Sequence, residues 1–258
     1  MPTDGAGPHV ATRPPRSLPV TTTTTTIPDR VATLPWDELH ASLDDHGFAQ
    51  TPAVLDADEC RGLAELFDAG RFRSTIDMAR HRFGQGEYKY FDHPLPDVIA
   101  ELRAALYPHL AEAANRWAER LRDDERYPDA LDAFLERYHA AGQTRPTPLI
   151  LRYGPGDWNA LHQDLYGDVA FPFQAVTLLD RPGEDFEGGE FVLLEQRPRA
   201  QSRAHVIDLQ RGAFLLFTTR QRPVEGSRGY YRAAMRHGVS TVTAGRRTTL
   251  GIVFHDAR

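Results

Sequence analysis

The sequence predicts an α+β fold, in which helices of the first half pack on an antiparallel barrel or double-sheet jelly roll formed by the second half. Two observations predict it. Before residue 147, apolar residues recur at three- and four-residue steps; after it, short β-branched or aromatic segments alternate with Gly, Pro and Asp turns. Helices followed by strands are typical of α+β proteins. The 258 residues, 41% hydrophobic and 26% charged, have the composition of a soluble globular protein.

The N-terminal residues have a different composition. Residues 1–30 contain 6 Pro and 8 Thr and no periodic apolar pattern. Such a segment buries too little apolar surface to offset the entropy of ordering. We therefore expect a disordered tail over residues 1–33 and a single domain over 34–258, with a helical layer over 34–146 and a β core over 147–258.

Apolar periodicity predicts four helices in the first half. Asp56 is suited to cap the second of them, and the third has one continuous apolar stripe that ends near Trp117. A helix with such a stripe packs against a sheet. The expected helices are Trp36–Asp45, Ala57–Ala69, Asp97–Arg122 and Asp129–Ala141.

Short segments rich in β-branched and aromatic residues predict the strands of the second half. Their even spacing and turn residues favour a closed or double-layered antiparallel sheet. The expected strands are Pro148–Tyr153, Phe173–Asp180, Gly189–Leu194, His205–Leu209, Ala213–Thr218, Met235–Thr243 and Thr248–His255.

Several classes of function are excluded by residues that the chain lacks. A single cysteine, Cys60, rules out an internal disulfide and any Cys-x-x-Cys zinc or redox site. The only lysine, Lys89, follows Tyr88, so there is no phosphate-binding Gly-Lys-Ser/Thr loop. No Gly-x-Ser-x-Gly motif or third dinucleotide-binding glycine occurs. No apolar run is long enough to span a membrane, so we expect a cytoplasmic protein without a membrane partner.

Three residues have the spacing of a metal site. On a β-strand, His162 and Asp164 project to the same face, and His237 follows on a later strand. Two imidazoles and one carboxylate leave three positions of an octahedron open, which suits Fe(II) that must also bind O2 and a co-substrate. The pair alone is weak evidence, since about one His-x-Asp is expected by chance in this composition.

Sequence around these residues carries more information. Arg152–Asp157 precedes the His-x-Asp pair, a Gly-Gly-Glu turn lies within Phe186–Phe191, and Met235–Ser240 surrounds the second histidine. With Gly245-Arg246-Arg247 and Gly251–Asp256, these segments resemble the Fe(II)- and 2-oxoglutarate-dependent dioxygenases. They are similar to prolyl-hydroxylase-like members, and more narrowly to a bacterial subgroup proposed to modify nucleic acids. The resemblance covers about residues 36–258.

The resemblance implies a double-stranded β-helix core and assigns roles to residues. His162, Asp164 and His237 would bind Fe(II), and Arg247 would bind the distal carboxylate of 2-oxoglutarate, with O2 as co-substrate and ascorbate as reductant in vitro. Only one of Arg246 and Arg247 can face inward on a strand, and the Gly-x-Arg spacing favours Arg247. Tyr153 would add a hydrogen bond to the same carboxylate, or bond to backbone instead.

The substrate is the most open question. We expect Trp158, Asn159, Tyr166 and Arg232 to contact it. Residues 197–247 contain 11 Arg against two acidic residues, in a chain of formal net charge −6, and these arginines could hold an anionic substrate such as nucleic acid, with a nucleobase as the oxidised group. Solvated strand edges explain the arginines equally well. The alternatives are a protein side-chain or small-molecule hydroxylase, and a jelly-roll binding module without catalysis. The arginines that could hold such a substrate are Arg197, Arg199, Arg203, Arg220, Arg222, Arg228, Arg232 and Arg236.

Overall fold

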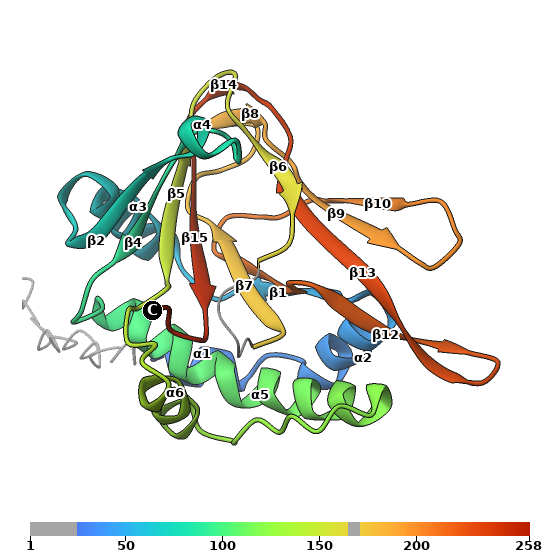
Figure 1. The fold of residues 1–258 in the computed structure, drawn as a ribbon. Coiled ribbons are helices and arrows are strands. Elements are labelled where there is room, and N and C mark those ends of the chain that lie inside the picture. The colour runs from blue at the N-terminus through green and yellow to red at the C-terminus, as the bar shows by residue number, and fades with distance from the viewer. Residues whose placement is uncertain (1–24, 165–170) are drawn as a thin grey trace, which may run out of the picture.

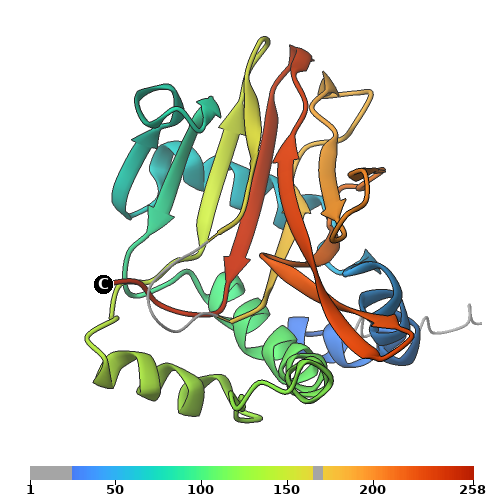
Figure 2. The ribbon, with the colours of Figure 1, turned by 45° about the vertical axis from the view of Figure 1, so that its right-hand side comes forward.

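Two antiparallel sheets face each other above a layer of helices (Figure 1). The computed structural model describes residues 25–164 and 171–258. Figure 2 shows, from a second direction, that helices α5 (Asp97–Leu121) and α6 (Leu131–Ala140) lie below the strands. The predicted α+β jelly roll with N-terminal helices is confirmed.

The larger sheet has the order β1-β11-β7-β15-β5-β4-β2. One face of it packs on the helices, and the other faces the smaller sheet. On β15, Leu250 and Ile252 belong to the core shared with α5, whereas Arg247 and Thr249 line a cavity between the sheets. Its strands are β1 (Phe48–Ala53), β2 (Phe72–Asp77), β4 (Glu87–Phe91), β5 (Leu149–Tyr153), β7 (Phe173–Leu178), β11 (Ala213–Thr218) and β15 (Arg247–Val253).

The smaller sheet has the order β10-β9-β13-β6-β3, and β12 pairs with β13. A two-stranded ladder of β8 and β14 closes the top of the molecule (Figure 1). The strands are β3 (Gly84–Gln85), β6 (Trp158–His162), β8 (Phe186–Gly188), β9 (Phe191–Gln196), β10 (Arg203–Ile207), β12 (Gln221–Gly226), β13 (Gly229–Val239) and β14 (Val242–Gly245).

The helices match their sequence signals closely. Asp56 caps α3 (Ala57–Ala69) by accepting hydrogen bonds from two backbone amides of the first turn. The apolar stripe of α5 is buried against the outer face of the larger sheet, with Leu102, Leu106 and Leu110 fully inaccessible. The remaining helices are α1 (Ile27–Ala32), α2 (Trp36–His46) and the single-turn α4 (Met78–His81). No helix in the described ranges is long and apolar enough to cross a membrane.

Three expectations about the chain are wrong in detail. Order does not begin near residue 34, because α1 is capped by Thr26 and buries Ile27 and Val31. Arg30 of this helix also makes an ion pair of 2.6 Å with Glu59. The part over 34–146 is not only helical, since it supplies β1 to β4. The expected strand at 235–243 is two strands, β13 and β14, and Ser240 and Thr241 lie between them. Residues 1–24 lie outside the described part.

Candidate active site

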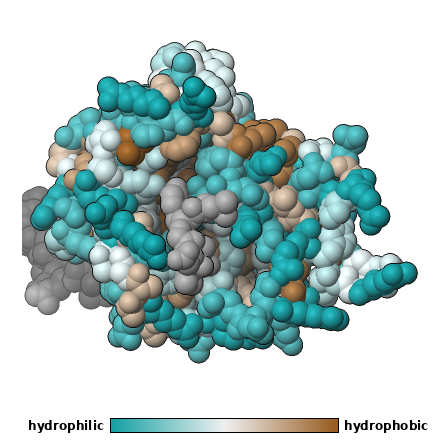
Figure 3. Space-filling model, in the orientation of Figure 1, coloured by the Kyte–Doolittle hydropathy of each residue, from teal (hydrophilic) through white to brown (hydrophobic). Residues whose placement is uncertain are grey.

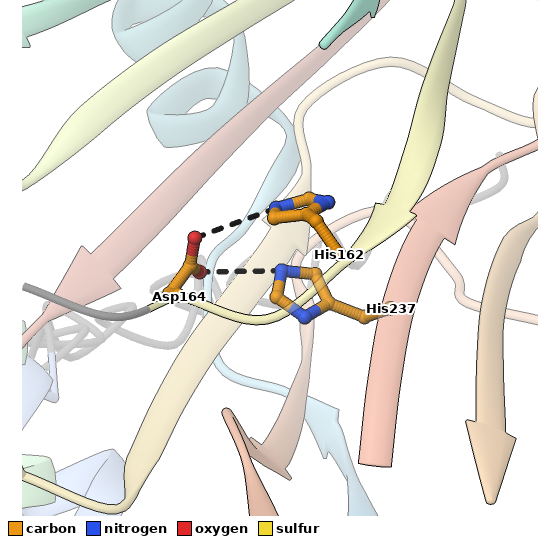
Figure 4. A group of neighbouring side chains, drawn as sticks. All are labelled: His162, Asp164 and His237. Carbon is orange, nitrogen blue, oxygen red and sulfur yellow. Dashed lines mark ion pairs between the residues drawn. The ribbon is translucent and has the colours of Figure 1, made fainter.

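The side chains of the three predicted metal ligands point toward one another (Figure 4), and all three line one cavity. His162 is the last residue of β6 and lies directly opposite His237 on β13, with the imidazole centroids 4.2 Å apart. The sequence predicts that Asp164 lies on the same strand as His162. Asp164 instead follows β6 and reaches the site from the segment after the strand. Its carboxylate oxygens lie 3.4 Å from His162 Nε2 and 3.2 Å from His237 Nε2.

Neighbouring residues fix the orientation of both imidazoles. His162 Nδ1 lies 2.7 Å from the carbonyl oxygen of Ala160. A carbonyl can only accept, so Nδ1 carries a proton, and in the neutral ring Nε2 is left with a lone pair that is free to bind a cation held beside Asp164. The ring of His237 is buried between Phe191, at 5.9 Å and nearly parallel, and Phe217, at 4.8 Å. Backbone and packing thus hold two Nε2 atoms toward one carboxylate.

The charges at the site suit a bound cation. Burial opposes ionisation of Asp164, yet the two imidazoles outweigh it and hold the pKa of this carboxyl well below its usual value. Burial also opposes protonation of His162, but the hydrogen bond and charge of Asp164 raise its pKa overall. Burial lowers the pKa of His237. A cation between these atoms satisfies the carboxylate and both Nε2 lone pairs, and two imidazoles with one carboxylate are the donor set of non-haem Fe(II).

Gln174 is a site residue that the sequence reasoning missed. It lies on β7, is 7% exposed, and its Nε2 donates a 2.8 Å hydrogen bond to Asp164 Oδ2. Every residue of β7 is buried, so a glutamine there stands out among Phe173, Ala175 and Val176. A polar side chain in a wholly buried strand was the signal that could have identified it. Its amide fixes the rotation of the Asp164 carboxylate.

Arg247 lines the same cavity from the larger sheet. Its side chain is 1% exposed, and its Nε and Nη1 atoms have no hydrogen-bond partner in the described part of the chain. Burial lowers the pKa of Arg247 to about 10, so it remains a cation at neutral pH. Arg246, its neighbour, is exposed. A buried guanidinium with unused donors, facing a cavity, fits the far carboxylate of a dicarboxylate such as 2-oxoglutarate.

Tyr153 and Gly189 lie around this arginine. Tyr153 is opposite Arg247 in the β5–β15 register, with its ring centroid 5.5 Å from the guanidinium carbon, and Asn159 Nδ2 donates to its hydroxyl at 3.4 Å. Gly189, in the Gly-Gly-Glu turn, has a φ of +65°. A Cβ there would lie 2.8 Å from Arg247 Cδ and 2.8 Å from a methyl carbon of Val242. The turn needs glycine because the arginine packs directly on its backbone.

The cavity has a volume of about 480 Å³, within the range of small-molecule sites. It is lined by β4, β5, β7 and β15 on one side and by β6, β9 and β13 on the other. The triad and Arg247 are therefore parts of one chamber between the two sheets.

The residues expected to contact substrate have different outcomes. Asn159 lines the cavity, but Trp158 is 40% exposed and does not. Arg232 is not brought to the cavity: it is exposed on β13 and forms an ion pair with Asp123 beyond the end of α5. Arg232 lies away from the cavity because it is five residues before His237 along an extended strand. Tyr166 lies outside the described residues.

Eight of the arginines between residues 197 and 247 fall into two groups. Arg222 is buried in an ion pair of 2.7 Å with Glu195, which Arg197 also contacts. Burial opposes ionisation of Glu195, but the hydrogen bonds of the two arginines lower its pKa overall. A second group is exposed and makes no side-chain ion pair with described residues: Arg199, Arg203, Arg220, Arg228, Arg236 and Arg246.

Comparisons with known proteins agree with this geometry. A family model of oxygenases, described as catalysing oxidative methylation of damaged DNA, matches residues 86–257. Uncharacterized proteins from two strains of Mycobacterium tuberculosis, CDC 1551 / Oshkosh and ATCC 25618 / H37Rv, are each 52% identical over 167 residues, which are 65% of this chain and 72% of theirs. A Pseudomonas putida prolyl-4-hydroxylase has a similar fold, with a TM-score of 0.51 and 18% identity over 86% of this chain and 99% of its own.

Proposed function

Because the chain belongs to the family of oxygenases described as acting on damaged DNA, we propose that it is an Fe(II)- and 2-oxoglutarate-dependent dioxygenase that oxidises a methylated base in nucleic acid. One observation carries the proposal. The His162, Asp164 and His237 triad opens into the same cavity as the buried guanidinium of Arg247, whose Nε and Nη1 atoms have no hydrogen-bond partner among the described residues. That cavity offers a metal-binding donor set at one side and an anion-binding group at the other.

The residues present fit both groups. His162, Asp164 and His237 would hold Fe(II), Gln174 would orient Asp164, and Arg247 would bind the far carboxylate of 2-oxoglutarate. With Fe(II) and 2-oxoglutarate bound, the site would support oxidation of a C–H bond by O2, coupled to decarboxylation of 2-oxoglutarate. The two facing sheets enclose the cavity, and the fixed ligands would orient the reacting groups.

The overall reaction balances for an N-methyl substrate. One oxygen atom of O2 enters succinate, as 2-oxoglutarate loses CO2, and the other enters the methyl group. The hydroxymethyl group then leaves nitrogen as formaldehyde, and the base regains a proton. A C-methyl or ring position would instead keep its hydroxyl group. A base inside a duplex cannot reach a metal in a cavity, so the substrate must be unpaired or flipped out.

Two further expectations belong to the proposal. We place the enzyme in the cytoplasm, where its single cysteine stays reduced, and we expect ascorbate to support turnover in vitro. Residues 34–258, together with α1, would form one catalytic domain, in which the sheets supply the site and the helices support the larger sheet.

Substitution of the triad tests the proposal. His162→Ala, Asp164→Ala and His237→Ala should each abolish Fe(II) binding, measured by metal analysis after anaerobic reconstitution, and succinate formation, measured with a methylated oligonucleotide. His205→Ala is the matched control, since His205 is a half-buried histidine on β10 and does not line the cavity. Wild-type metal content and turnover in any triad variant would contradict the assignment. Turnover with a peptide and none with an oligonucleotide would favour a protein hydroxylase instead.

A further inference from the structure

The rim of the cavity carries two side chains that belong neither to the metal triad nor to the proposed 2-oxoglutarate site. Arg82 and Phe83 follow the single-turn helix α4, both are exposed, and both line the cavity. Phe83 is 47% exposed, and its ring stacks on His81 with centroids 5.4 Å apart. Leu161, on the adjoining β6, also lines the cavity and is 45% exposed. An aromatic ring, an aliphatic side chain and a guanidinium therefore border the entrance together.

The side chain of Arg82 makes no hydrogen bond or ion pair with any residue in the parts of the chain that the structure describes. Most other arginines of this half of the chain are paired, as Arg80 is with Asp77 at 3.2 Å and Arg71 is with Asp92 at 3.4 Å. Helix α4 lies at the top of the molecule in Figure 1, and Figure 3 shows hydrophobic groups among hydrophilic ones on that part of the same face. The rim is thus both apolar and positively charged.

The segment that carries these residues is held firmly in place. Phe83 donates its amide to the carbonyl of Met78 at 3.1 Å and accepts from the amide of Ala160 at 2.8 Å. Met78 is fully buried. At Gly84, with a φ of +142°, a Cβ would lie 2.2 Å from the carbonyl oxygen of Trp158, so β3 approaches β6 as closely as glycine allows. The rim is therefore preformed, which reduces the entropy lost when a ligand binds.

The backbone of Arg82 is unusual. It adopts a left-handed conformation, with a φ of +59°, at the end of α4. Residues other than glycine adopt this conformation infrequently and at some cost. The reversal ends α4 after one turn and brings Arg82 and Phe83 onto the rim.

Given the proposed function, we propose that Arg82 and Phe83 form a subsite for the nucleotide next to the oxidised one in a single strand. Phe83 stacks on the neighbouring base, and Arg82 binds the phosphate that joins the two nucleotides. Once the target base has entered the cavity, the next base is unpaired or loses a stacking partner, and an exposed aromatic ring replaces that partner. A guanidinium is the matching group for the phosphate.

Binding of short fluorescein-labelled oligothymidylates, followed by anisotropy at several salt concentrations, tests the subsite. Phe83→Ala should weaken binding roughly five- to 150-fold. Arg82→Gln should lower the dependence of log affinity on log salt by about 0.7, the loss of one phosphate contact on a single strand. On a probe of the same length with abasic sites, Phe83→Ala should have no effect, while the effect of Arg82→Gln should remain.

Controls separate the subsite from the function itself. Arg80→Gln removes an exposed arginine of α4 that does not line the cavity, and Tyr230→Ala removes an aromatic that is 40% exposed in the β12–β13 hairpin. Both should bind as the wild type does, and all four variants should keep its melting temperature. If the wild type binds the probes but the rim variants match the controls, the subsite is wrong and the function stands. If the wild type binds no probe and no oligonucleotide stimulates succinate release, both are wrong.

Discussion

Replacement of Arg247 by methionine should separate the stability of the protein from its affinity for 2-oxoglutarate. Arg247 is 1% exposed, and burial lowers its pKa to about 10. A decrease of that size corresponds to a desolvation cost on the order of 3 kcal/mol in the absence of an anion. Methionine has a similar length and no charge, so Arg247→Met should leave the ligand-free protein as stable as the wild type or more stable.

The affinity for 2-oxoglutarate should change in the opposite direction. Two donors of Arg247, Nε and Nη1, have no partner in the described part of the chain. Each hydrogen bond to a carboxylate contributes about 1.5–3 kcal/mol, so the loss of both should weaken binding roughly a hundredfold to ten-thousandfold. The affinity of Arg247→Lys for 2-oxoglutarate should lie between those of the wild type and Arg247→Met, since an ammonium restores the charge without the bidentate contact.

Thermal unfolding with Mn(II) in place of Fe(II) is the assay, because it measures binding without turnover. At a concentration of 2-oxoglutarate one hundred times the dissociation constant, the wild type should gain about 2.7 kcal/mol. For a chain of this size that is roughly 5–11 °C in melting temperature. Arg247→Met should show almost no gain, and Arg246→Gln, its exposed neighbour, should behave as the wild type. A full gain in Arg247→Met, or its loss in Arg246→Gln, would refute the reasoning.

Three other predictions follow from single contacts. Gln174→Leu should weaken Co(II) binding roughly ten- to a hundredfold, because Asp164 loses the 2.8 Å hydrogen bond from Gln174. Visible absorption of Co(II) measures the affinity, and an unchanged affinity would exclude a positioning role for Gln174. Gly189→Ala should displace Arg247 and so weaken the binding of 2-oxoglutarate but not of the metal. Gly183→Ala, at a φ of +76° with no atom within 4 Å of a Cβ, should leave the binding of both unchanged, and equal effects of the two variants would attribute the loss to backbone strain. The hydrogen bond from Arg30 lowers the pKa of Glu59, so its stabilisation is present above about pH 4.5 and is lost as the pH falls through the folded value. Glu59→Gln should therefore cost about 1 kcal/mol at pH 7 and progressively less as the pH falls below 4.5, and a loss that does not depend on pH would contradict this.

The helices could be predicted because their signals are local. Helix α3 has the bounds expected from its capping aspartate and its apolar spacing. Strand β2 was missed because it lies at one end of the larger sheet, is only partly buried along its length and lacks a clear alternation. Its partner β4 was missed with it. Helix α1 was missed because six residues with a proline give too short a pattern. Its stability comes from burial of Ile27 and Val31 and from the contact of Arg30 with Glu59.

The site shows the same division. The triad and Arg247 could be located from motifs and from strand alternation, which makes Arg247 face inward when Arg246 faces solvent. Gln174 could have been singled out as a polar residue in a buried strand, but its contact with Asp164 and the position of the rim could not be located. Gln174 meets Asp164 only because β7 passes beside the end of β6. Arg82 and Phe83 reach the entrance because β3 pairs with β6 across about 75 residues of sequence. Both contacts depend on how the completed sheets place their strands.

The most direct test of the proposed chemistry is the stoichiometry of products. The purified protein is supplied with Fe(II), ascorbate, 2-oxoglutarate and a single-stranded oligonucleotide that contains an N-methylated base, and succinate and formaldehyde are measured together. The proposed function predicts one formaldehyde for each succinate formed above the rate without oligonucleotide, and no stimulation by the unmethylated strand. Succinate formation that the methylated strand leaves unchanged, or the absence of any succinate, would contradict it.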